Sequence, residues 1–214
     1  MSATMSTPSP KAPWPTLAPL VVAGGSLATG RELARQAGAT GREARLVDEP
    51  GNGRELRAAL DGATAVAVIP ARTVSSLAAQ VQAILGAVGD PAAGPQIVLV
   101  TGFSIGHGLG HALNTPERLA DRRRAETLVR ASGVPYTIVR PTWLTGDPPG
   151  HYAVTLTQDP HADGMIARAD LAAVCLAAVA EPAARGTTFA VFAQPGRPPR
   201  SWAPLFSALR RDAA

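Results

Sequence analysis

The sequence has one cysteine and no long hydrophobic run, and each scarcity excludes a class of protein. Cys175 has no partner cysteine among the 214 residues, so no disulfide can form within the chain. Each apolar stretch is interrupted by glycine, proline or a charged residue within about a dozen positions, which is too short to span a bilayer. We therefore expect a soluble, cytoplasmic protein in which Cys175 packs as a small hydrophobic residue.

The first 18 residues contain neither the apolar core of a signal peptide nor the arginines of a transit peptide. They are rich in serine, proline, threonine and alanine, and Lys11 is their only charged residue. We expect residues 1–18 to form a disordered tail. Residues 19–211 are long enough for one domain with its own core, and the chain is 46% hydrophobic.

Aromatic residues are scarce, at 4%, and none lies in the most basic stretch, which has arginines at positions 122–124. A helix would distribute these arginines around its axis, and Asp121 and Glu126 interleave with them, which is typical of a solvated helix face. The net charge of +4 therefore does not indicate a nucleic-acid partner, which would need stacking platforms or a basic stripe. We expect a small-molecule substrate and no membrane partner, and a homodimer is an open alternative.

The sequence does have a regular alternation of strand-length and helix-length segments. This order predicts a doubly wound parallel sheet of the Rossmann-like α/β class, with ligands beyond the carboxyl ends of the strands. The predicted strands are residues 20–23, 44–47, 65–69, 97–100, 136–139 and 189–192. The predicted helices are residues 29–37, 54–60, 74–88, 116–131, 169–180 and 202–210.

The first strand runs into a glycine-rich turn of the kind that binds a dinucleotide pyrophosphate. Gly24 and Gly30 fit the first and third positions of Gly-x-x-Gly-x-x-Gly, but Leu27 takes the middle position, where the backbone comes nearest the phosphates. Either Gly25 replaces it through a shifted turn or the phosphate site is weakened; an ordinary strand-to-helix turn is the alternative. The candidate cofactor-binding residues of this turn are Gly24, Gly25, Ser26, Leu27 and Gly30.

Three residues at other strand ends are further candidate cofactor contacts. Asp48 follows the second strand, close to the spacing at which an acid accepts hydrogen bonds from an adenosine ribose. It favours NAD over NADP because a carboxylate repels a 2′-phosphate, although Asp48 can also simply begin a turn. Pro70 and Thr101 follow two later strands.

Two later segments carry a family resemblance. Residues 125–144 include Glu126 and the run Ser-Gly-Val-Pro-Tyr-Thr-Ile-Val-Arg-Pro, and residues 166–174 read Ile-Ala-Arg-Ala-Asp-Leu-Ala-Ala-Val. Both resemble segments of atypical short-chain dehydrogenases/reductases, the NmrA-like and NAD(P)H-binding group, over residues 18 to 210 or so. The resemblance implies a nicotinamide cofactor, and it implies that Arg140 and Arg168 stabilise the fold through ion pairs with acids such as Asp170 or Glu126.

The chain departs from that group in two ways. A third strand normally follows the second, but here residues 49–53 lead directly to a helix, so we expect the sheet edge to lack one strand. Many short-chain dehydrogenases also use a tyrosine whose pKa is lowered by a lysine, and no lysine follows Lys11. The matching positions are Arg118 and Arg122, and arginine can stabilise an oxyanion but does not readily exchange a proton. We expect Tyr136 to be a core residue.

Two loops would overhang the strand ends, at residues 101–114 and 141–165, and they contain all four histidines. His107 or His111 can provide acid–base catalysis near neutral pH, and Thr101 or Ser104 can donate to a substrate carbonyl. The alternatives are loop histidines without a chemical role and hydroxyls that cap turns. We predict no metal site, because three glycines between positions 106 and 110 argue against a helix that would pair the two histidines. The candidate catalytic residues are Thr101, Ser104, His107, His111 and Arg122, and the candidate substrate contacts are Phe103, Trp143, His151 and Tyr152.

Three functions compete on this sequence. The first is an NAD(P)-dependent oxidoreductase acting on a small, largely apolar carbonyl or enone. The second is a cyclase, isomerase or dehydratase that has lost the cofactor and uses loop histidines; Leu27, the missing strand and the missing lysine favour it. The third is a dinucleotide-sensing regulatory protein of the NmrA-like kind. We take the first as the working hypothesis because the family resemblance implies it; the fold alone does not fix the function.

Overall fold

The computed structural model describes residues 17–48, 53–70, 76–112 and 114–213. A parallel sheet runs through it in the order β2-β1-β3-β4-β5-β9. All the predicted strands are present, with ends that differ from the prediction by no more than three residues. They are β1 (Leu17–Ala23), β2 (Arg42–Val47), β3 (Ala65–Val68), β4 (Gln96–Val100), β5 (Tyr136–Pro141) and β9 (Thr187–Gln194).

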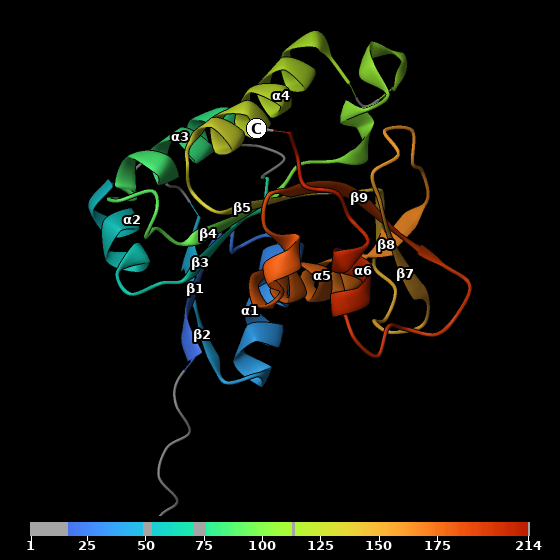
Figure 1. Cartoon of the computed structure of the whole chain (residues 1–214), viewed down its shortest axis with the longest axis horizontal. Helices are drawn as coiled ribbons and strands as arrows, with labels where there is room; N and C mark the ends of the chain where they lie inside the picture. Colours follow the sequence, from blue (N-terminus) through green and yellow to red (C-terminus); the bar gives the residue numbers. More distant parts are fainter. Residues whose placement is uncertain (1–16, 49–52, 71–75, 113, 214) are drawn as a thin grey trace, which may run out of the picture.

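Helices cover both faces of this sheet, so the doubly wound prediction is confirmed (Figure 1). One face packs against α1 (Ala28–Ala39), α5 (Arg168–Ala180) and α6 (Ala203–Ser207), and the other against α2 (Gly53–Leu60), α3 (Leu77–Ala87) and α4 (Pro116–Ala131). Successive residues of a strand point to opposite faces. On β1, Leu20 and Val22 join the core under α1 and α5, whereas Val21 and Ala23 join the core under α3 and α4.

The start of β1 and the position of β2 can be compared with two of the sequence predictions, the bounds of the tail and the missing strand. β1 begins at Leu17, so its first two residues fall within the predicted tail, and residues 1–16 lie outside the described residues. β2 is the outermost strand at its edge of the sheet in the described part of the chain. That arrangement is the one expected from the missing third strand.

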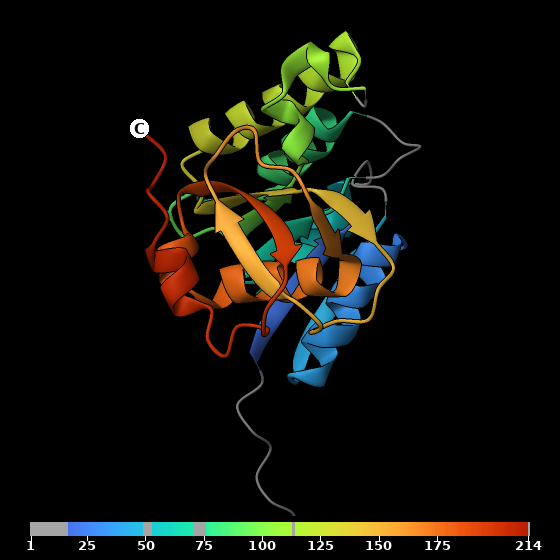
Figure 2. The same cartoon turned by 90° about the vertical axis from the view of Figure 1, so that its right-hand side faces the viewer.

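The predicted loop at residues 141–165 is not wholly irregular, because it contains two short strands and the first residue of a third. β6 (Trp143–Thr145) pairs with β8 (Met165–Ala167), and β7 (Ala153–Thr157) pairs antiparallel with β9. Figure 2 shows these yellow to orange strands beside the red β9. Two of them are three residues long, which is too short for an alternating pattern to be recognised.

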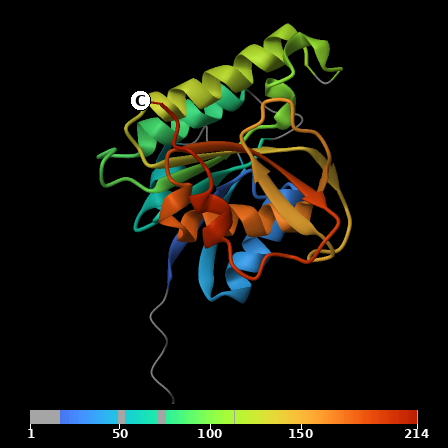
Figure 3. The ribbon, with the colours of Figure 1, turned by 45° about the vertical axis from the view of Figure 1, so that its right-hand side comes forward.

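The loop after β4 contains two short 3-10 turns, η1 (Phe103–Ile105) and η2 (Gly108–Gly110). It lies against the loop that precedes β8, as Figure 3 shows for the green and orange segments. A Cβ built on Gly106 would lie 1.8 Å from the carbonyl oxygen of Pro160, so only glycine permits this approach. None of the described helices is long and apolar enough to cross a membrane.

Candidate functional site at the carboxyl edge of the sheet

The turn between β1 and α1 depends on two glycines. Gly24 has a φ of +90°, and a Cβ there would lie 2.4 Å from the carbonyl oxygen of Ile69, at the end of β3. A Cβ on Gly30 would lie 2.3 Å from the carbonyl oxygen of Gly24. No side chain tolerates such contacts with backbone atoms, so these glycines let the turn close tightly between strand and helix.

Leu27 does not disrupt this turn. It is the N-cap of α1, with extended dihedral angles (φ −72°, ψ 153°), and its half-buried side chain packs against the core on the α1 and α5 face. Gly25 has no positive φ, and it makes room for the side chain of Leu46 instead of shifting the turn. Because the side chain of Leu27 makes no cap hydrogen bond, the amides of the first turn of α1 can bind an anion.

Two charged side chains form hydrogen bonds with the backbone N–H and the backbone carbonyl oxygen of Ser26. Oδ1 of Asp48 accepts a hydrogen bond of 2.6 Å from the N–H of Ser26, and the guanidinium of Arg31 donates to the Ser26 carbonyl oxygen. The sequence predictions did not include Arg31. Its position directly after Gly30, the last glycine of the turn, could have indicated that its side chain reaches the turn. Asp48 therefore fixes the turn as well as lying at the end of β2, and a cation lies close to it.

Pro70 lies beside the same turn. The N–H of Ile69 donates to the carbonyl oxygen of Ala23 at 2.9 Å, so the end of β3 adjoins the end of β1. Residues 71–75, which follow Pro70, lie outside the described residues.

Thr101 lies at the end of β4, and its hydroxyl donates to a buried carboxylate. Oγ1 of Thr101 is 3.0 Å from Oε1 of Glu126, whose residue is only 2% exposed. Glu126 also accepts bonds of 2.9 and 2.7 Å from Arg140 and one of 3.2 Å from Arg130. The ion pair expected between Arg140 and Glu126 is therefore present, and it orders the end of β4.

Ser104 and Arg122 form a second polar group beside β4. The buried Ser104 hydroxyl donates to Oδ1 of Asn114 at 3.0 Å and accepts a bond of 3.3 Å from Nη1 of Arg122. Burial, followed by repulsion from Arg118, lowers the pKa of Arg122. The prediction of a solvated helix face holds for Arg123 but is wrong for Arg122, because this side of α4 packs on the loop after β4.

Three of the four histidines come together with two aromatic rings, in a group that we call the histidine–aromatic cluster: Phe103, His107, His111, Trp143 and His161. The ring of Phe103 lies 5.6 Å from His107, 5.1 Å from His111 and 5.7 Å from Trp143. His107 is 5.4 Å from His111 and 5.6 Å from His161, and His111 is 5.7 Å from Trp143. Phe103 is 5% exposed and Trp143 is 44% exposed, so the cluster has a buried base and an open side.

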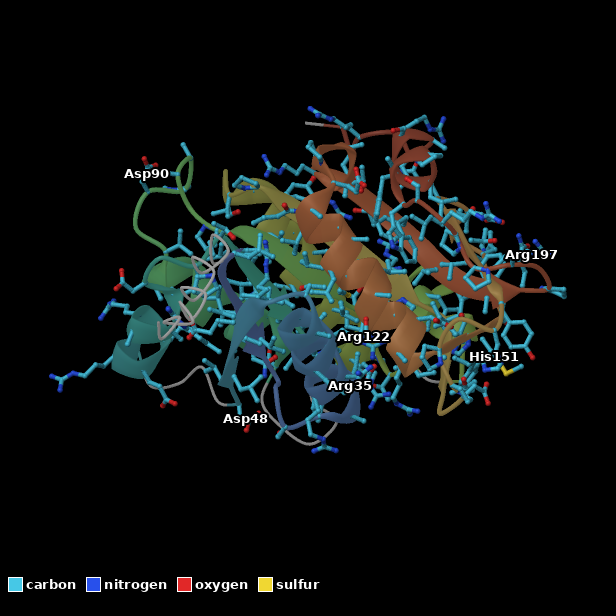
Figure 4. All side chains as sticks on the ribbon, turned by 90° about the horizontal axis from the view of Figure 1, so that it is seen from below. Arg35, Asp48, Asp90, Arg122, His151 and Arg197 are labelled. Atoms are coloured by element: carbon cyan, nitrogen blue, oxygen red, sulfur yellow. The ribbon has the colours of Figure 1, made fainter. Side chains whose placement is uncertain are left out.

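The other predicted side chains lie away from this cluster. His151 and Tyr152 are exposed and precede β7, and neither has a ring contact with the cluster within the described residues. In Figure 4, His151 lies toward the same end of the molecule as Arg197, away from Asp48.

Tyr136 and Arg168 have structural partners. Tyr136 begins β5 at the opposite, amino edge of the sheet, and its hydroxyl donates to Asp212 at 3.1 Å; burial raises its pKa. Arg168 donates to the carbonyl oxygen of Thr145 at 2.8 Å, so it stabilises the fold through a backbone contact and not through the expected acid. Asp170 instead accepts from the N–H of Gly150 at 2.9 Å.

A tight glycine turn after β1, an acid after β2 and polar loops after β4 and β5 define a Rossmann-like dinucleotide-binding protein. Residues 26–182 match the model of the NAD(P)H-binding family, and the chain belongs to this family. That result confirms the resemblance to the atypical short-chain dehydrogenase/reductase group.

Solved structures share this fold at low sequence identity. A short-chain dehydrogenase/reductase of Veillonella parvula, solved with NADP, is 14% identical, with a TM-score of 0.67 over 83% of this chain and 95% of that one. A Rossmann-fold NAD(P)-binding family protein of Shigella flexneri is 19% identical, with a TM-score of 0.63 over 86% and 95%. ChuY of Escherichia coli O157:H7, described as an anaerobillin reductase, is 17% identical, with a TM-score of 0.65 over 84% and 98%.

A sequence relative is also found among plant proteins. An uncharacterized chloroplastic protein of Arabidopsis thaliana is 32% identical over 117 residues, which is 53% of this chain. The match spans 42% of that protein's length.

Proposed function

We propose that this chain is an NAD(P)H-dependent reductase of a small, largely apolar carbonyl or enone. The observation that supports the proposal is the position of the glycine turn and the histidine–aromatic cluster along one edge of the sheet. Only β3 separates β1 from β4, so the ends of these strands lie roughly 10 Å apart, and one extended ligand can contact both.

The residues of the turn fit a nicotinamide dinucleotide. The amides at the start of α1 would bind the pyrophosphate, and Asp48 would accept hydrogen bonds from the adenosine ribose. We propose NADH over NADPH, because the Asp48 carboxylate would repel a 2′-phosphate, although Arg31 nearby reduces that repulsion. When bound, the nicotinamide supplies the hydride.

The cluster provides a surface and a proton for the substrate. Trp143, at 44% exposed, offers flat apolar area, the buried ring of Phe103 supports it, and His111 contacts both rings. We assign His111 as the proton donor to the substrate, because imidazole exchanges protons near neutral pH. Thr101 and Ser104 are weaker candidates, since both hydroxyls donate to partners within the chain.

The test is NADH oxidation with a panel of cyclic enones and aromatic aldehydes. We expect His111→Gln to lower kcat by about a hundredfold or more and to remove one limb of the pH–rate profile. Arg197→Gln, at an exposed position that was never assigned to the site, is the control and should leave kcat unchanged. Equal activity of both variants would contradict the assignment of His111.

A dinucleotide-sensing regulator is the second candidate. The internal hydrogen bonds of Thr101 and Ser104 favour it, because they leave fewer hydroxyl protons for catalysis. This reading predicts tight NADH binding without turnover of any carbonyl in the panel. Lack of binding to either dinucleotide would favour the non-redox alternative on the same fold.

A further inference from the structure

Arg122 has no carboxylate within ion-pair distance among the described residues, and Asp121 and Glu126 act on its charge only from farther away. The neighbouring arginines on this side of the sheet, Arg130 and Arg140, pair with Glu126 and Asp212. The charges of these two acids and two arginines sum to zero. Arg122 has no ion pair in the part of the chain that the structure describes. A partly buried, uncompensated cation is costly unless a ligand pairs with it.

The guanidinium of Arg122 contacts the two residues on either side of Phe103, which belongs to the histidine–aromatic cluster. A Cβ built on Gly102 would lie 2.9 Å from Nη1 of Arg122, so this glycine makes room for the cation. The same nitrogen donates to Ser104, which uses one of the five N–H donors of arginine. Gly102 and Ser104 flank Phe103 in the sequence, and the ring of Phe103 lies 5.7 Å from the exposed ring of Trp143.

The position of Arg122 argues against a role in binding the cofactor pyrophosphate. Its contacts are with the loop after β4, whereas the amides that suit a pyrophosphate begin α1, after β1. The intervening β3 separates the two by roughly 10 Å along the edge. An anion on Arg122 would therefore belong to the other ligand of the site.

We infer that Arg122, held in place by Ser104, binds a carboxylate of the substrate while the flat apolar part of that substrate lies on the exposed ring of Trp143, which Phe103 supports. The inference rests on the proposed function and narrows its substrate class to a conjugated carbonyl compound that also carries a carboxylate. Bidentate pairing with a carboxylate uses two of the remaining guanidinium donors.

The test compares trans-cinnamate with its neutral, nearly isosteric amide, trans-cinnamamide, by isothermal titration of the full-length protein. We expect the wild type to bind cinnamate about tenfold tighter or more, which matches a charge-assisted hydrogen-bond pair. Arg122→Gln should abolish this preference, and Arg122→Lys should retain part of it because the charge remains. Arg123→Gln, on the same helix but exposed, is the matched control and should behave as the wild type.

Parallel titrations with NADH and NADPH separate this inference from the proposed function. Thermal melts of each variant check that it folds. Unchanged dinucleotide affinity in Arg122→Gln, with the cinnamate preference lost, supports the inference. Equal affinities of the wild type for the two probes, or no binding of cinnamate, would overturn it, as would an equal loss of NADPH affinity, which would assign Arg122 to the cofactor. Failure of the wild type to bind either dinucleotide would instead count against the proposed function.

Discussion

The two regions that meet at the carboxyl edge of the sheet are built differently. The turn after β1 is made of backbone: two glycines set its shape, and the amides of the first turn of α1 follow it. The region around the loop after β4 is made of side chains, with four hydrogen bonds to the carboxylate of Glu126 and no ion pair to Arg122 among the described residues. The backbone region suits a ligand part common to many proteins of this fold, whereas we propose that the side-chain region selects the substrate.

The largest expected effect comes from breaking the support of the side-chain region. Glu126→Gln removes the charge that Arg130 and Arg140 share, and it leaves Arg140 partly buried without a carboxylate partner, whereas Arg130 keeps Asp212. We expect a loss of about 3–5 kcal/mol in the free energy of unfolding, measured by urea denaturation. Arg124→Gln, exposed on the same helix, should change it by less than about 0.5 kcal/mol. Equal losses of stability in the two variants would show that the ion pairs of Glu126 do not stabilise the fold.

Disruption of the glycine turn after β1 should lower the free energy of unfolding by a smaller amount. A Cβ at Gly30 would press against the carbonyl oxygen of Gly24, so Gly30→Ala should lower stability by about 1–3 kcal/mol and weaken NADH binding. Gly38→Ala lies on the same helix, with no atom within 4 Å of the added Cβ, and should raise stability by about 0.5–1 kcal/mol. If both variants shifted the urea midpoint in the same direction, the packing argument would be wrong.

The choice of dinucleotide gives a smaller, more specific test. In Asp48→Asn the amide oxygen can still accept from Ser26, so the turn should persist while the negative charge is lost. We expect the ratio of NADH to NADPH affinity to fall about fivefold, which corresponds to about 1 kcal/mol at an exposed site. An unchanged ratio would remove Asp48 from the specificity argument.

The smallest effect should appear on α1, at its partly exposed pair Glu32 and Arg35. The hydrogen bond from Arg35 lowers the pKa of Glu32 to about 2, against 4.5 ordinarily. Because the folded state then binds the proton less readily than the unfolded state, the stabilisation is complete above the unfolded pKa and is lost as pH falls toward 2. Glu32→Gln should therefore cost less than about 1 kcal/mol at pH 7, and the difference from the wild type should vanish in acid. A difference that persisted at low pH would contradict the ion-pair origin.

Helix α4 shows what local sequence signals determine. Residues 116–131 were predicted with both ends correct, because Thr115 accepts from the N–H of Arg118 at the start and Gly133, with a φ of +74°, follows the end. For α3 the observed start is Leu77, after the cap Ser76, whereas the prediction began three residues earlier, in a part that lies outside the described residues.

The site could be predicted only in part, for a physical reason. The residues of the glycine turn lie close together in the sequence, so its shape can be predicted from the sequence. The histidine–aromatic cluster joins residues from two loops that are distant in sequence, and nothing local shows that His161 enters it while His151 does not. The burial of Arg122 likewise depends on how α4 is rotated against the loop after β4. Both features depend on tertiary packing, which local sequence patterns do not determine.

The most direct test of the central claim is a fluorescence titration of the purified protein with NADH and NADPH at near-physiological salt. The structure and the family predict saturable binding of a nicotinamide dinucleotide, and Asp48 predicts the tighter binding for NADH. Absence of binding to both dinucleotides would contradict the claim that the turn after β1 is a working cofactor site.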